Sequence, residues 1–196
     1  MRKRKTKGFI FIISGPSGSG KTTLLVNVLK DKDLKKKIIR SVSFTTRPKR
    51  SGERNGKDYI FISGKKFQEL KRAKKILEWT KYLGYYYGTP KDIVDKQLKS
   101  GNSIVLCLDL KGAGVVKKLY PGQVETIFIV APSLDVLHAR IRNRCSRTAG
   151  REIRDRLNLA RKELKAASRY DWCLLNQDLA QVTGELKEII SKKILN

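Results

Sequence analysis

The sequence predicts an α/β fold of three layers with a parallel sheet at its core. Short apolar runs of strand length at residues 9–13, 103–110 and 124–130 predict buried strands. Segments of helical composition lie between them. Strands that alternate with helices favour parallel pairing through right-handed crossovers. The length of 196 residues is enough for one such domain with a sizeable core.

Capping and turn residues place the remaining elements. Thr89 followed by Pro90 is typical of a helix start, with Thr89 as the capping residue. Ser133 is expected to cap a later helix, and Asp178 with Gln181 to form a capping box for the last one. We expect further strands at 38–44, 59–62, 76–82, 85–87 and 172–175, and helices at 22–30, 67–75, 90–99, 134–144, 151–167 and from 179 onward.

The first apolar run leads into a glycine-rich loop. Residues 15–22, GPSGSGKT, match G-x-x-x-x-G-K-[ST] at every fixed position, between a strand and a helix. A phosphate-binding loop requires this context, because loop N–H groups and a helix N-terminus together form an anion cradle. We expect Lys21 to reach the β- and γ-phosphates and the Thr22 hydroxyl to ligate Mg²⁺.

The alternative to such a cradle is a chance turn rich in Gly and Ser, which the complete motif and its flanks disfavour. The chain is therefore expected to have a P-loop NTPase fold and to bind a nucleoside triphosphate. The predicted triphosphate-binding residues of the loop are Gly15, Pro16, Ser17, Gly18, Ser19, Gly20, Lys21, Thr22 and Thr23.

The chain carries a large positive charge, with 44 Lys and Arg against 18 Asp and Glu and a formal net charge of +26. Basic runs occur at 35–37 and 71–75, and a basic tail at 1–7. Such a field favours salt-sensitive, non-specific nucleic-acid binding. We favour a solvated basic surface instead, because no RNP-like aromatic motif or helix-turn-helix pattern accompanies the charge.

Cysteine usage and the length of the apolar runs indicate a cytoplasmic protein. Cys107, Cys145 and Cys173 show no paired or metal-like spacing, which favours reduced thiols. The apolar stretches are far shorter than a membrane helix. Five apolar residues after the basic tail are too few for a signal peptide. We expect no membrane association, and the sequence leaves the oligomeric state open.

Two polar segments interrupt the pattern of buried strands. Residues 41–90 are aromatic and rich in turns, and residues 140–156 carry seven arginines against Glu152 and Asp155. Phosphoryl transfer to a small acceptor needs an acceptor-binding part and a lid that excludes water. We therefore expect one domain with its core at 8–40, 91–139 and 157–196, an inserted acceptor segment at 41–90 and an arginine-rich lid at 140–156.

The middle of the chain contains a series of short motifs, each present once. They are SVSFTTRPKR at 41–50, GE at 52–53, NGKDY at 55–59, LEW at 77–79, Gly84 with YYGT at 86–89, and LD at 108–109 with Gly112. Their order and spacing resemble those of the guanylate kinase family. The resemblance extends from Gly8 to about residue 190 and is more specific than the phosphate loop alone. It implies a nucleoside monophosphate kinase that uses ATP, GMP and Mg²⁺, with the use of deoxy-GMP left open.

The resemblance also implies an acceptor site in residues 41–109. Arg47, Arg50, Tyr59 and Tyr87 match the residues that hold the GMP phosphate, and guanidinium forks with phenol hydroxyls suit a dianion. Glu78 matches the residue that pairs with the guanine N1–H and 2-amino groups, Ser43 and Thr89 match hydroxyl donors to O6, and Asp109 is assigned to base reading with them. Adenine has a lone pair at N1 and would leave the carboxylate without a donor.

Lid and adenine-side residues follow from the same resemblance. Arg140, Arg144 and Arg156 fall where family members place arginines over the transferred group, and they join Lys21 and Arg47 as the expected catalytic residues. The spacing from Arg144 to Arg156 is one residue longer than expected, so Arg147 and Arg151 are alternatives to Arg156. Asn176 is expected at the adenine side of ATP.

The chain departs from the family pattern at two places. Cys107 stands where the family usually has an acid, two residues before Asp109. Loss of the acid at this position could weaken metal binding or lower the rate of phosphoryl transfer. It could equally have no effect, since Cys packs well in a buried strand. Residues 176–178 read NQD instead of the more usual Asn-Asp-Asp.

Three other functions compete with guanylate kinase activity. Another small-molecule kinase on this scaffold would lack the guanine set, and the presence of Glu78 with Ser43 argues against it. A non-catalytic phosphopeptide-binding relative would not need the complete phosphate loop. A nucleic-acid-binding protein would rest on the charge alone.

Overall fold

A computed structural model describes residues 8–144 and 150–195 of the chain. The predicted basic tail at 1–7 and the part of the predicted lid with Cys145 and Arg147 lie outside the described residues. The chain forms two compact units. Of the described residues, unit 1 holds 8–10 and 38–124, and unit 2 holds 11–37 and 125–195.

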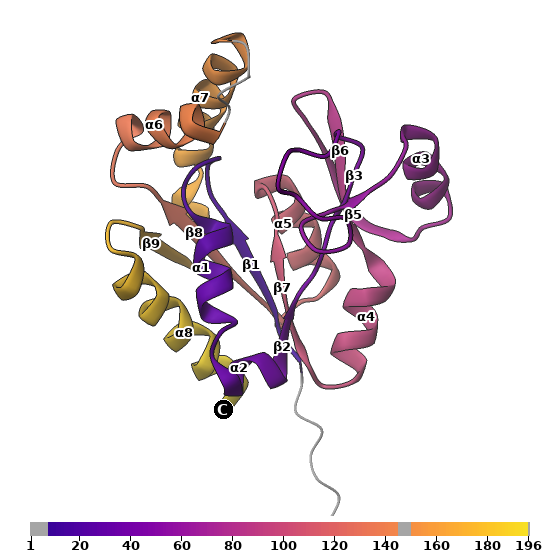
Figure 1. Cartoon of the computed structure of the whole chain (residues 1–196). Helices are drawn as coiled ribbons and strands as arrows, with labels where there is room; N and C mark the ends of the chain where they lie inside the picture. The colour runs from indigo at the N-terminus through magenta and orange to yellow at the C-terminus, as the bar shows by residue number, and fades with distance from the viewer. Residues whose placement is uncertain (1–7, 145–149, 196) are drawn as a thin grey trace, which may run out of the picture. The chain divides into compact units, whose positions relative to one another are not determined.

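Unit 1 contains a four-stranded sheet and a separate pair of strands (Figure 1). In the four-stranded sheet the order is β4-β3-β6-β5, with β6 antiparallel to both β3 and β5. β2 pairs in parallel with β7, from Ile38 opposite Ser103 to Arg40 opposite Val105. The elements are β2 (Ile38–Arg40), β3 (Phe44–Thr45), β4 (Ile60–Phe61), α3 (Gly64–Arg72), β5 (Ile76–Tyr82), β6 (Tyr85–Pro90), α4 (Lys91–Lys99), β7 (Ser103–Cys107) and α5 (Leu110–Leu119).

Unit 2 contains the strand–loop–helix segment that the glycine-rich motif predicted. Strands β1, β8 and β9 lie side by side in that order, and β8 and β9 run parallel with Ile127 opposite Trp172. Helix α1 packs against α8, and α6 against α7 (Figure 1). The elements are β1 (Ile10–Ser14), α1 (Lys21–Val28), α2 (Lys32–Lys37), β8 (Val124–Val130), α6 (Leu134–Arg144), α7 (Gly150–Leu164), the 3₁₀ turn η1 (Ala167–Arg169), β9 (Trp172–Leu175) and α8 (Leu179–Leu195).

The apolar runs located the core strands β1 and β8, whereas the strand predicted at 103–110 ends at Cys107 and α5 begins at Leu110. Every residue of β1 is buried, as are the central residues of β8, because these strands pack on both faces. Two of the predicted caps are also present. The Ser133 Oγ accepts from the Val136 N–H at 3.1 Å, and an Asp178 carboxylate oxygen accepts from the Gln181 N–H at 2.7 Å.

Several local predictions are wrong. Thr89 lies in β6 and does not cap α4; its hydroxyl instead donates to Glu78, and Pro90 is the residue before the helix. The capping box of α8 is half formed, because the Gln181 side chain donates to Glu185. The predicted strand at 38–44 is split into β2 and β3, and α7 ends at Leu164.

Helices α2 and α5 were not predicted. The sequence of α5, LKGAGVVKKL, has two glycines, which lower intrinsic helix propensity. Its N-cap and its packing override that preference. An Asp109 carboxylate oxygen accepts from the Gly112 N–H at 2.7 Å, and Ala113 and Val116 are buried where α5 packs against β5.

Among the described residues, no helix has the length and apolar character to span a membrane.

Candidate active site

The glycine-rich loop of unit 2 connects β1 to α1. Gly20 precedes α1 with φ of 96°, and no side chain caps the helix. The first turn contains no acid, so its N–H groups and the positive end of the helix have no negative partner within the turn. A Cβ at Gly20 would also collide with the Asn176 amide nitrogen. Both the positive φ and this close contact therefore require glycine at position 20.

The Lys21 side chain folds back over this loop. Its Nζ donates to the carbonyl oxygens of Gly15 at 2.6 Å and Pro16 at 2.8 Å. These contacts hold the ammonium group beside the loop, where it can exchange carbonyl oxygens for phosphate oxygens without a large movement. The hydroxyls of Thr22 and Thr23 lie on the exposed first turn of α1.

Three residues from distant parts of the sequence brace the loop within unit 2. The Asn176 amide donates to the Ser19 carbonyl at 2.7 Å. The Arg156 guanidinium donates to the Ser17 hydroxyl at 3.1 Å. The Arg140 guanidinium donates to the Gly18 carbonyl at 3.3 Å.

Arg156 is only 7% exposed, so a guanidinium charge is held against the loop with little access to water. The structure therefore brings Arg140, Arg156 and Asn176 to the loop, and their roles toward a nucleotide stay predictions. Arg144 lies at the end of α6, and its side chain is outside the described residues.

In unit 1, Arg47 is the centre of an aromatic and charged cluster. It is 7% exposed, and its two terminal nitrogens donate to the two Glu53 oxygens at 2.7 and 3.0 Å. Its guanidinium carbon lies 5.4 Å from the centroid of the Tyr59 ring, and Tyr59 makes an edge contact with Tyr87 at 5.8 Å. Buried guanidinium forks recognise carboxylate and phosphate in the same bidentate manner.

Glu53 fixes this part of the chain through two neighbours. Its Oε2 also accepts the backbone N–H of Arg50 at 2.8 Å, so one carboxylate orders both predicted phosphate-binding arginines. Burial alone would raise the pKa of Glu53, but the hydrogen bonds from Arg47 and Arg50 outweigh it and hold the pKa below its ordinary value. Glu53 therefore stays ionised and keeps Arg47 in place.

A second carboxylate of unit 1, that of Glu78 on β5, is buried and hydrogen-bonds to a threonine hydroxyl instead of an arginine. It is 6% exposed, and its Oε1 accepts the Thr89 hydroxyl at 2.6 Å. Burial raises the pKa of Glu78 to about 7, against the Thr89 hydrogen bonds, which lower it, and with a smaller contribution from the charge of Asp109. In its ionised form this buried carboxylate accepts hydrogen bonds, so it is suited to a ligand that supplies N–H donors.

Gly112 forms one wall beside this carboxylate. A Cβ at Gly112 would lie 2.6 Å from Glu78 Oε2, so any other residue would displace the carboxylate. Asp109 is close by, but one of its oxygens already accepts from the Gly112 N–H. Ser43 precedes β3 and its carbonyl accepts the Ile60 N–H.

Comparison with known proteins decides the family. A family model described as "Guanylate kinase" matches residues 7–193. The guanylate kinase of Wolbachia pipientis wMel is 39% identical over 191 residues, which is 97% of this chain and 93% of that protein. The guanylate kinase of Rickettsia prowazekii is 39% identical over 188 residues, 96% of this chain and 93% of that protein. This chain belongs to the guanylate kinase family.

A solved structure supports the same conclusion at the level of the fold. The crystal structure of guanylate kinase from Anaplasma phagocytophilum matches with a TM-score of 0.77 at 28% identity, covering 97% of this chain and 88% of that one. The predicted α/β fold of P-loop NTPase type is confirmed, and so is the family resemblance.

Two residues of this guanylate kinase chain were missed as site residues by sequence reasoning. Glu53 and Gly112 stood within the motifs that carried the resemblance but received no role, because their function lies in holding other side chains. A signal for Glu53 was present in the sequence: it is the first acid after Arg47 and Arg50, two arginines that both need fixed positions. No comparable signal marks Gly112 until β5 and α5 are packed together.

Proposed function

We propose that this chain transfers the γ-phosphoryl group of ATP to GMP, giving ADP and GDP, with Mg²⁺ and in the cytoplasm. Membership of the guanylate kinase family makes it a nucleoside monophosphate kinase. The observation that supports our assignment of the acceptor base is the buried Glu78 carboxylate, hydrogen-bonded to Thr89.

The donor half of the proposal uses the loop of unit 2. Loop and first-turn N–H groups bind the triphosphate, and Lys21 moves from the Gly15 and Pro16 carbonyls to the β- and γ-phosphates. Arg140 and Arg156 neutralise charge that develops on the transferred group, and Arg144 is assigned the same role from the sequence. Asn176 orders the loop and lies on the adenine side.

The metal requirement fits the residues that are present. Among the described residues no cluster of three or more His, Cys, Asp or Glu side chains could hold a metal by itself. That fits Mg²⁺, which keeps several waters and is bound mainly through substrate phosphates. Thr22 would supply a protein oxygen, and the metal would neutralise charge on the β- and γ-phosphates.

The acceptor half uses unit 1. Arg47, Arg50, Tyr59 and Tyr87 bind the GMP phosphate, so that its oxygen is oriented for attack.

Glu78 accepts the N1–H and 2-amino donors of guanine, and Ser43, Thr89 and Asp109 complete the reading of the base. Guanine donors favour the ionised carboxylate, so GMP binding lowers the pKa of Glu78 and releases a proton.

An ADP-release assay tests the proposal. Purified protein is mixed with ATP, Mg²⁺ and, in turn, GMP, deoxy-GMP, AMP, CMP and UMP, with chelator added as the metal control. We expect turnover with GMP, loss of turnover with chelator, and at most background rates with AMP, CMP and UMP. Equal rates with GMP and AMP would contradict the assignment of guanine to the Glu78 pocket.

A further inference from the structure

Three lysine ammonium groups lie over two aromatic rings on one face of unit 1. Lys71 Nζ of α3 is 3.7 Å from the centroid of the Trp79 ring, and Lys111 Nζ of α5 is 5.6 Å from the same ring. Lys81 Nζ of β5 is 5.7 Å from the Tyr86 ring, which makes an edge contact with Trp79. We call these five residues the Trp79 surface.

The Trp79 surface lies on the opposite face of the β5–β6 ribbon from the acceptor residues. Successive strand residues point to opposite faces, so Trp79 and Lys81 face away from the buried Glu78. Tyr86 pairs across the ribbon with Lys81, while Tyr87 contacts Tyr59 in the acceptor cluster. A ligand on the Trp79 surface would therefore leave GMP binding unobstructed.

Positive charge exceeds negative charge in the segment that supplies α3 and most of β5. Residues 65–81 carry seven cations but only two acids. Of the acids, Glu69 pairs with Lys66 at 3.2 Å, and Glu78 is buried on the acceptor side. Within the described part of the chain, no carboxylate forms an ion pair with Lys71, Lys81 or Lys111. The seven cations are Lys65, Lys66, Lys71, Arg72, Lys74, Lys75 and Lys81.

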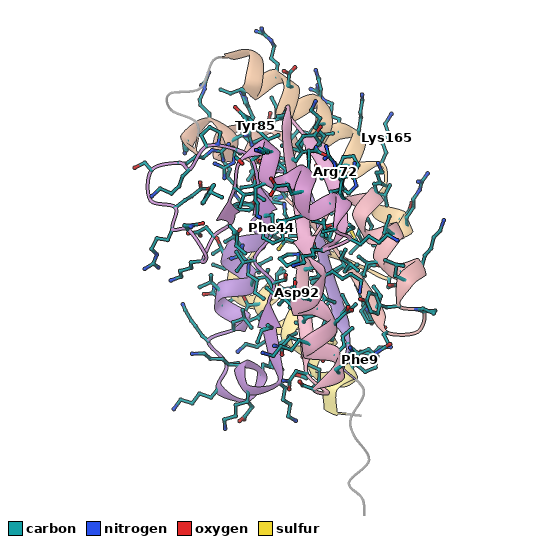
Figure 2. The ribbon with its side chains drawn as sticks, turned by 90° about the vertical axis from the view of Figure 1, so that its right-hand side faces the viewer. Phe9, Phe44, Arg72, Tyr85, Asp92 and Lys165 are labelled. Atoms are coloured by element: carbon teal, nitrogen blue, oxygen red, sulfur yellow. The ribbon has the colours of Figure 1, made fainter. Side chains whose placement is uncertain are left out.

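Cations gathered without counter-charges repel one another, and the aromatic faces relieve only part of this repulsion. A polyanion would relieve the rest. Figure 2 looks onto the side of unit 1 that carries α3, where Arg72 is labelled.

The chemistry of the surface selects among polyanions. A membrane would require exposed apolar side chains, but Phe67, the buried apolar residue of α3, is fully covered. An acidic protein would use the charges but not the rings. Single-stranded nucleic acid uses both, because its phosphates neutralise lysines and its bases stack on aromatic side chains.

We propose that the Trp79 surface binds single-stranded nucleic acid. Lys71 leaves the face of Trp79 and contacts phosphates together with Lys81 and Lys111, and a base stacks on the ring face that Lys71 covers in the free protein. The absence of an aromatic-basic sequence motif does not oppose this, because the five residues come from α3, β5, β6 and α5. This binding is separate from the transfer reaction and does not depend on it.

The test measures fluorescence anisotropy of a labelled single-stranded RNA of about 16 nucleotides across a salt series. A triple variant, K71A/K81A/K111A, is compared with K162A/K165A/K192A, which removes three exposed lysines: Lys162 of α7, Lys165 immediately after α7 and Lys192 of α8. Loss of three phosphate contacts should lower the slope of log K against log salt by about 2 and weaken binding roughly 100-fold near 0.1 M salt. The α7–α8 variant should keep most of the affinity and the slope.

A second readout locates the contact. In W172F, Trp79 is the remaining tryptophan, and its fluorescence should change on titration with unlabelled RNA. Phosphate transfer to GMP should be unchanged in the triple variant, which shows that it is folded. Equal weakening in both triple variants, no binding of RNA by the unmodified protein, tight binding of anionic phospholipid vesicles in its place, or unchanged Trp79 fluorescence would overturn the proposal.

Discussion

Burial of Glu78 should make the free protein less stable as the pH rises toward neutrality. The carboxyl has an ordinary pKa of 4.5 and a pKa of about 7 in the folded chain. Between these two values the folded state binds more protons than the unfolded state. The free energy of unfolding therefore falls with rising pH over this window and is level above it, as far as Glu78 is concerned.

The difference between the two pKa values corresponds to about 3 kcal/mol, at about 1.4 kcal/mol per pH unit. Glu78→Gln keeps the size of the side chain and an acceptor for Thr89 but removes the ionisation. The variant should therefore become more stable than the unmodified protein by up to about 3 kcal/mol as the pH is raised from 4.5 to 8. The two proteins should differ least at acidic pH, where the carboxyl is neutral.

Urea unfolding between pH 4.5 and 8, followed by circular dichroism without nucleotide, measures this difference. Glu188→Gln, at an exposed position of α8, is the matched control and should show no such trend. Parallel pH profiles for Glu78→Gln and the unmodified protein would refute the reasoning. A stability advantage of Glu78→Gln over the unmodified protein that grows toward acidic pH would also refute it, because that trend would mean that the pKa of Glu78 is lowered in the folded chain.

The remaining predictions concern catalysis. Lys21→Ala should reduce kcat for phosphate transfer by about 100-fold or more, because the variant lacks the preorganised ammonium charge that stabilises the transferred phosphoryl group. A kcat that is retained in an ADP-release assay would contradict the assignment of Lys21. Glu53→Ala should raise KM for GMP about tenfold and leave KM for ATP unchanged, since Arg47 loses its bidentate partner; an equal rise in both would indicate general destabilisation. Gly112→Ala should likewise raise KM for GMP by displacing the Glu78 carboxylate, while Gly114→Ala, where a Cβ meets open space, should not.

The elements with strong local signals were predictable from the sequence. The wholly apolar run before the glycine-rich loop indicated β1, and the loop motif indicated the start of α1. Helix α5 was not predictable in this way, because its stability depends on the Asp109 cap and on packing against β5, which outweigh two unfavourable glycines.

For the candidate site, sequence reasoning proposed ligand-binding residues but missed residues that hold other side chains. Lys21 was assigned from the loop motif, and Arg47 and Glu78 from the family resemblance; these roles stay predictions. The role of Glu53 required the bidentate geometry with Arg47, and the close approach of Gly112 required the packing of α5. The Trp79 surface was not predictable from the sequence either, since its lysines and rings come together only when α3 and α5 flank the β5–β6 ribbon.

The preference for GMP over AMP in Glu78→Gln tests the central claim most directly. In the unmodified protein kcat/KM for GMP should exceed that for AMP by a large factor, because adenine would leave a buried carboxylate without donors. In the variant this ratio should fall by about 10-fold to 100-fold while KM for ATP stays the same. A ratio that Glu78→Gln leaves unchanged would contradict the account.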